Sequence, residues 1–137
     1  MWWIYALLSA FFAALTAIFA KIGIKGVDSD LATAIRTVII LIIAWSMVIV
    51  RGTQSGISTL SKTNVFFIVL SGIATGLSWI FYFRALQLGP VSKVASVDKL
   101  SVAFAIILAI IFLGEPLTWK TAIAASLIIT GTIIMIY

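Results

Sequence analysis

The 137-residue sequence contains no cysteine and no histidine. Without cysteine there is neither a disulfide framework nor a thiol nucleophile, and without both residues the usual zinc sites and a side chain that titrates near neutral pH are excluded. We therefore expect no cofactor and no metal. Because no pair of carboxylates converges on one face either, we expect that the protein is not an enzyme.

Charged residues are scarce as well. They make up 9% of the chain, whereas 64% of its residues are hydrophobic and the mean hydropathy is +1.29. A soluble domain carries about 25% charged residues. This balance predicts an integral membrane protein whose partner is the lipid bilayer, with no nucleic-acid partner. The net charge of +5 is attributed mostly to lysines and arginines that contact lipid headgroups at the ends of apolar segments.

Five apolar segments predict an all-α fold with five transmembrane helices. They cover residues 2–20, 31–50, 65–86, 93–113 and 117–137. At about 1.5 Å per residue, each can cross a hydrocarbon layer of about 30 Å. The first segment has no basic region before it and no convincing cleavage site, so we expect it to remain a helix. The connections are short, which predicts a single transmembrane domain over residues 1–137.

Asp98 and Lys99 stand side by side in the fourth segment. The apolar run from Leu100 to Leu113 covers only about 21 Å, so the helix must include residues before it to cross the membrane. The two charges then lie about two turns inside, where each costs about 2.5–3.5 kcal/mol. Adjacent side chains point about 100° apart on a helix and are not expected to satisfy each other. Asp98 is therefore expected to find a partner on another helix.

Two arginines are candidates for that partner. Arg36 lies inside the second segment by the same length argument, and Arg84 lies one turn before the end of the third. Trp79 and Tyr82 share a face of the third segment near the depth expected for Asp98, where they line a pocket or fill helix contacts. The charges form either a structural ion pair between helices or a substrate and proton site in a central cavity.

Small residues recur four positions apart in the third and fifth segments, as they also do in the first at Ser9, Ala13 and Ala17. Gly72 and Gly76 lie in the third segment, and Ala122, Ser126 and Thr130 lie in the fifth. Such ridges let helix backbones approach closely, so they are predicted to be packing surfaces. The ridge on the fifth segment is expected to pack outside the helices that surround the cavity or across a dimer.

The basic residues that flank the segments divide evenly between the two sides of the membrane. If the helices alternate in direction, one side holds Lys21, Lys25 and Lys93, and the other holds Arg51, Lys62 and Lys120. The excess of Lys and Arg on the cytoplasmic side normally sets the orientation of a membrane protein. An even division is typical of a chain that inserts in both orientations, a dual topology.

The order and spacing of these features resemble a known family. The junction ALQLGPVSKVA, the segment LGEPLTWKTAIAASLIITG and the stretches TAIFAKIGIKG and LATAIRTVIILI are similar to an EamA domain of the drug/metabolite transporter superfamily. Most members carry two such domains as an inverted repeat, whereas this chain resembles the half-size bacterial type with one. Its SVDKLS stretch departs from the neutral, proline-containing stretch of many relatives, so their substrates are not transferred to this chain.

The resemblance implies a transporter in the bacterial inner membrane. Because two repeats of opposite orientation rock around a central site in such transporters, one five-helix chain needs a second copy, which predicts an antiparallel homodimer. The expected substrate is a small anionic or zwitterionic metabolite. We expect its charged group to contact Lys99, Arg36 and Arg84, its apolar wall to be Trp79 and Tyr82, and the proton to be carried by Asp98. A non-transporting accessory subunit and a small channel are the alternatives.

Overall fold

The computed structural model describes residues 1–137 and contains no strand. Five helices are long and apolar enough to cross a membrane, and they run over Trp2–Gly23, Ser29–Val50, Lys62–Leu88, Val91–Leu113 and Trp119–Ile136. Each overlaps one of the five predicted segments. The prediction of an all-helical chain with five helices long enough to cross a membrane is confirmed.

Polar side chains set the start of two of these helices. Helix α2 (Ser29–Val50) begins after Asp28, whose Oδ1 accepts hydrogen bonds from the backbone N–H groups of Asp30 and Leu31 at 2.9 and 3.1 Å. Helix α6 (Trp119–Ile136) begins after Thr118, whose Oγ1 accepts from the N–H of Thr121 at 3.1 Å. The first N–H groups of a helix have no partner within the helix, so these caps stabilise its start, typically by about 1 kcal/mol.

The fourth apolar segment is not one regular helix. It consists of α4 (Val91–Asp98), which follows Pro90, and α5 (Leu100–Leu113), with Lys99 between them. At the junction the N–H of Lys99 donates to the carbonyl of Ser96 at 3.1 Å, a bond over three residues instead of four. This tighter turn interrupts the α-helix beside the two charges, and such mid-helix interruptions often mark hinges.

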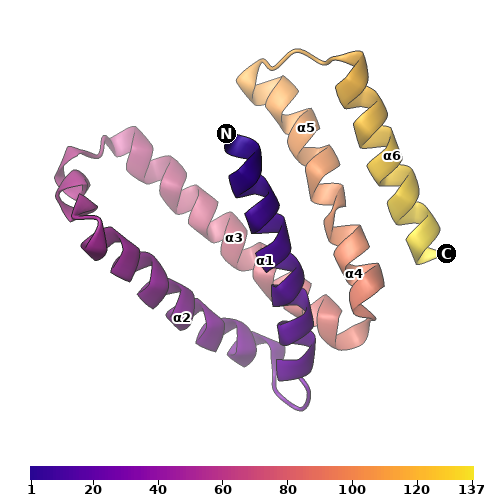
Figure 1. The fold of residues 1–137 in the computed structure, drawn as a ribbon, viewed down its shortest axis with the longest axis horizontal. Helices are drawn as coiled ribbons and strands as arrows, with labels where there is room; N and C mark the ends of the chain where they lie inside the picture. The colour runs from indigo at the N-terminus through magenta and orange to yellow at the C-terminus, as the bar shows by residue number, and fades with distance from the viewer. The chain divides into compact units, whose positions relative to one another are not determined.

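The chain divides into two compact parts, and the first comprises residues 1–19 and 88–137. It contains most of α1 (Trp2–Gly23) together with α4, α5 and α6, and α6 packs against both α4 and α5 (Figure 1). Thr132 on α6 is only 4% exposed, and its hydroxyl donates to the carbonyl of Ser96 on α4 at 3.0 Å. Near the end of α6, the Lys93 ammonium donates to the carbonyl of Ile136 at 2.8 Å.

The second part comprises residues 20–87. Here α2 and α3 (Lys62–Leu88) run antiparallel and are joined by the 3₁₀ helix η1 (Thr53–Thr59) (Figure 1). At the other end, the side-chain amide of Gln87 donates to the carbonyl of Val27 at 2.7 Å. This bond ties the end of α3 to the turn before α2. Phe83 and Leu86 near the end of α3 are fully buried.

The two small-residue ridges are largely open. On α6, Ala122 is half-buried, but Ser126 and Thr130 are exposed, and the less exposed face carries Ala125 and Thr132 instead. On α3, a Cβ added at Gly72 or Gly76 would meet no atom within 4 Å, so no backbone approaches closely there. Packing of these ridges against a second chain stays a prediction.

The Thr132 hydroxyl offers a test of the α4–α6 contact. Replacement by Val keeps the shape but leaves the Ser96 carbonyl without this donor, so Thr132→Val should lower the free energy of unfolding by about 0.6–1 kcal/mol. Thr130→Val, which removes an exposed hydroxyl from the same helix, should change it by less than about half that amount. Reversible unfolding of the wild-type protein and the two variants in mixed micelles measures both changes in the free energy of unfolding. Equal changes in the two variants would contradict a stabilising hydrogen bond from Thr132 to Ser96.

Candidate functional site

Arg36 on α2 lies against two aromatic rings of α3. Its guanidinium carbon is 4.3 Å from the ring centroid of Phe83 and 5.3 Å from that of Trp79. Residues four apart share one face of a helix, so α3 presents both rings to the same cation. Each cation–π contact is worth about 0.5–2 kcal/mol, the more so where water is excluded. The two rings hold the guanidinium in place.

The same guanidinium is incompletely satisfied. Its Nη1 atom is buried and has no hydrogen-bond partner. A buried donor without a partner costs about 1–3 kcal/mol, and more when it is charged. The aromatic rings compensate the charge but accept no conventional hydrogen bond, so this atom has the chemistry to bind an oxygen of an anion.

A groove of about 450 Å³ lies between α2 and α3. It is lined by Thr37, Ile40, Leu41, Ala44, Ile68, Ser71, Gly72, Thr75, Gly76 and Trp79. The lining is mainly apolar, and the hydroxyls of Thr37 and Thr75 already donate to carbonyls of their own helices at 2.9 and 2.8 Å. Because Trp79 both lines the groove and contacts Arg36, the guanidinium of Arg36 lies next to one end of this apolar groove.

The structure brings only some of the predicted residues together. Arg36 and Trp79 are in contact, and Tyr82 is half-buried with its ring centroid 6.1 Å from that of Phe83. Arg84 is exposed, and it lies about 140° around the helix from Trp79. It is therefore not part of this cluster. Phe83 was missed from the sequence, although its position one turn after Trp79 is a signal that points to it.

Asp98 and Lys99 contact each other. The Lys99 Nζ is 3.8 Å from the Asp98 Oδ2, and the two side chains are 59% and 40% exposed. The interruption of the helix at Lys99 lets the two side chains approach each other, although at this distance they do not fully satisfy each other. An exposed ion pair of this length is weak. Pairing of Asp98 with Arg36 or Arg84 stays a prediction.

No group of three or more His, Cys, Asp or Glu residues is arranged to hold a metal ion. In the cluster beside the α2–α3 groove, the Arg36 guanidinium and the rings of Trp79 and Phe83 are the groups that could contact a ligand. Their arrangement, one guanidinium beside an apolar groove, suits an anion that carries an apolar portion.

Comparison with known proteins agrees with these features. The EamA-like transporter family matches residues 1–137. The chain is also similar to a protein of Sinorhizobium sp. described as "Uncharacterized transporter in cobO 3'region", with 44% identity over 134 residues that cover 98% of this chain and 95% of that protein. No solved structure matches the chain. Both matches point to a transporter rather than an enzyme, and because the family match spans the whole length, the chain belongs to the EamA-like transporter family.

Proposed function

We propose that the protein transports a small anionic or zwitterionic metabolite across the bacterial inner membrane by alternating access. The single observation that carries this proposal is the buried Nη1 of Arg36, which has no hydrogen-bond partner and stands beside the α2–α3 groove. A carboxylate or phosphate of the substrate supplies the missing acceptor. Charge-assisted hydrogen bonds of this kind are about twice as strong as neutral ones.

The rest of the substrate lies against the aromatic wall. Trp79 presents its ring to the groove, and Tyr82 follows three residues later on the same helix. The contacts of Arg36 with Trp79 and Phe83 orient its planar fork before the substrate arrives, which lowers the entropic cost of binding. Lys99 and Arg84 are both exposed. In a dimer, these residues of the second copy are the further cations that lie near the substrate.

The transporting unit in this proposal is an antiparallel homodimer. One chain supplies five membrane helices. Transporters with inverted repeats place their substrate between two units of opposite orientation, and a second chain inserted in the opposite direction supplies the missing unit. The even division of flanking lysines and arginines is compatible with both orientations.

Proton coupling is assigned to Asp98. Its contact with Lys99 is long, exposed and located at the interruption between α4 and α5. Gain of a proton by the carboxyl removes the attraction to Lys99, so protonation is able to bias the conformation of this junction. A carboxyl at such a hinge can link proton movement to alternation between the two sides of the membrane.

Arg36→Met tests the substrate site. Proteoliposomes with wild-type protein are screened with radiolabelled carboxylic acids, amino acids and phosphate esters, and we expect saturable uptake of at least one. Uptake by the variant should be at least about tenfold lower than by the wild-type protein, because the variant lacks a charge-assisted hydrogen bond of about 1.5–3 kcal/mol. Its free energy of unfolding should stay within about 1 kcal/mol of wild type, because the lost cation–π contacts are offset by removal of an unpartnered donor.

Arg51→Lys is the control for that experiment. Arg51 is exposed just beyond the end of α2, and Lys keeps the flanking positive charge, so this change should leave uptake unchanged. Wild-type uptake by Arg36→Met, or equal loss in both variants, would contradict the substrate role of Arg36. If the wild-type protein takes up none of the compounds, a non-transporting subunit becomes the better account, and flux without saturation would indicate a channel.

Asp98→Asn tests the coupling. The amide cannot carry the proton, so uptake driven by a pH gradient should fall to the level of empty liposomes, whereas exchange of labelled for unlabelled substrate should continue. Asn keeps the size of the side chain. Uptake that still follows the pH gradient in this variant would show that the proton travels by another route.

Orientation can be measured with one introduced cysteine, since the chain has none of its own. Gln54 lies exposed in η1, between α2 and α3, where a thiol is accessible from one side of the membrane only. With Gln54→Cys, a membrane-impermeant maleimide should label part of the population in intact cells and the remainder in inverted vesicles. Complete labelling from a single side would rule out the antiparallel homodimer.

A further inference from the structure

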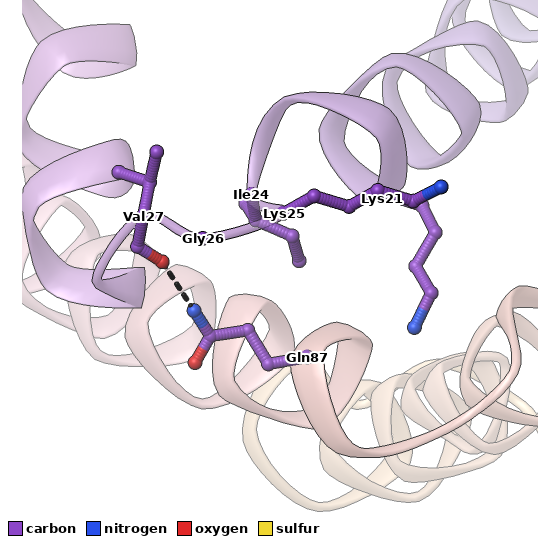
Figure 2. Close-up of a pocket in the computed structure, with 6 residues that line it drawn as sticks. All are labelled: Lys21, Ile24, Lys25, Gly26, Val27 and Gln87. Carbon is purple, nitrogen blue, oxygen red and sulfur yellow. Dashed lines mark hydrogen bonds between the residues drawn. The ribbon is translucent and has the colours of Figure 1, made fainter.

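A second pocket lies at the helix ends of the second part of the chain. Its volume is about 310 Å³, and it is lined by Lys21, Ile24, Lys25, Gly26, Val27 and Gln87 (Figure 2). These residues come from the end of α1, the turn that follows it and the end of α3. Helix ends of membrane-spanning segments lie at the level of the lipid headgroups. The pocket therefore faces the headgroup region and not the hydrocarbon core.

The lining of this pocket carries two positive charges and no carboxylate. Lys25 is exposed, and the half-buried Lys21 donates through its ammonium to the carbonyl of Leu86 on α3. Asp28 is close in sequence, but its Oδ1 caps α2 by accepting from two backbone N–H groups, and it does not line the pocket. The local charge thus favours an anion.

Several contacts give the pocket its shape. Gln87 on α3 donates from its side-chain amide to the carbonyl of Val27 at 2.7 Å, which closes one side. Gly26 has φ +75°, a backbone conformation that side chains rarely adopt, and it turns the chain between the lysines and Val27. Figure 2 shows the Lys21 side chain reaching toward α3 and the Lys25 side chain extending along the end of α1.

We propose that this pocket binds the phosphate group of an anionic phospholipid. Its volume equals roughly ten water molecules at about 30 Å³ each, which leaves room for a phosphodiester with a glycerol headgroup. Lysine binds phosphate as a point charge, and basic pockets between membrane helices are suited to lipid headgroups.

The neighbouring surface favours a lipid over a soluble phosphate ester. Ile22, next to Lys21 and preceding the turn, is 62% exposed, and Phe19 one turn earlier is 65% exposed. A lipid whose phosphate is held by the lysines can lay its acyl chains along such apolar side chains, whereas a soluble ester cannot. The site is separate from Arg36 and the α2–α3 groove, so it goes beyond the proposed transport function and does not depend on it.

Native mass spectrometry of the purified full-length chain tests this site. The probes are phosphatidylglycerol and phosphatidylcholine with identical acyl chains, mixed with the protein in detergent. The protein should retain phosphatidylglycerol in preference to phosphatidylcholine. Lys25→Gln should reduce that preference about fivefold, which corresponds to about 1 kcal/mol for one lysine near a lipid surface. Lys25→Arg should keep it.

Lys25 is the residue to replace because it is exposed and its replacement leaves the Lys21–Leu86 contact in place. Lys62→Gln, at an exposed lysine that begins α3, is the matched control and should not change the preference. Equal retention of both lipids by the wild-type protein would overturn the proposal, as would an equal loss in Lys62→Gln. Displacement of phosphatidylglycerol by soluble glycerol phosphate would assign the pocket to a soluble ester and would also overturn it.

Discussion

Hydrocarbon offers no hydrogen-bond partner, and this constraint accounts for most of the structure. A backbone that crosses the membrane must satisfy its own N–H and C=O groups, so the chain is built of helices. The hydroxyls of Thr37, Ser46 and Thr75 follow the same rule, because each donates to a carbonyl four residues earlier in its own helix. Against this background, the unpartnered Nη1 of Arg36 stands out. A polar atom that the fold leaves unsatisfied is where a ligand has the most to contribute.

The lack of hydrogen-bond partners in hydrocarbon also bears on whether a second chain is needed. In an apolar 18-residue stretch of each spanning helix, at most 11% of the residues are buried. Lipid tails, however, cover apolar side chains as well as protein does. Exposed hydrophobic area is therefore no argument for a dimer. The exposed charges of Asp98 and Lys99 within the fourth span are a better one, since neither is stable against lipid. They require water or protein beside them, and a cavity shared by two copies, as proposed above, would supply both.

The helices could be predicted from the sequence because hydropathy reports directly on the transfer of each segment into lipid. Details that depend on side-chain geometry could not. The interruption at Lys99 was missed because apolar composition does not distinguish one helix from two in line. Phe83 was overlooked because an aromatic residue in an apolar run carries no charge signal, although it lies nearer to Arg36 than Trp79 does. The small residues at Ser126 and Thr130 suggested a contact, but the buried face of α6 is rotated toward Thr132.

Depth in the membrane gives the cations different roles. Arg36 lies within a membrane-spanning helix, where aromatic rings replace water around its guanidinium. Its buried Nη1 still lacks a hydrogen-bond acceptor. Lys21 and Lys25 lie at a helix end, where water and headgroups are available, so their charge acts on lipid rather than on substrate. In an antiparallel dimer the two copies of this lysine pocket would face opposite leaflets. Anionic lipid in both leaflets would then hold the two orientations equally, which fits flanking charges that favour neither side.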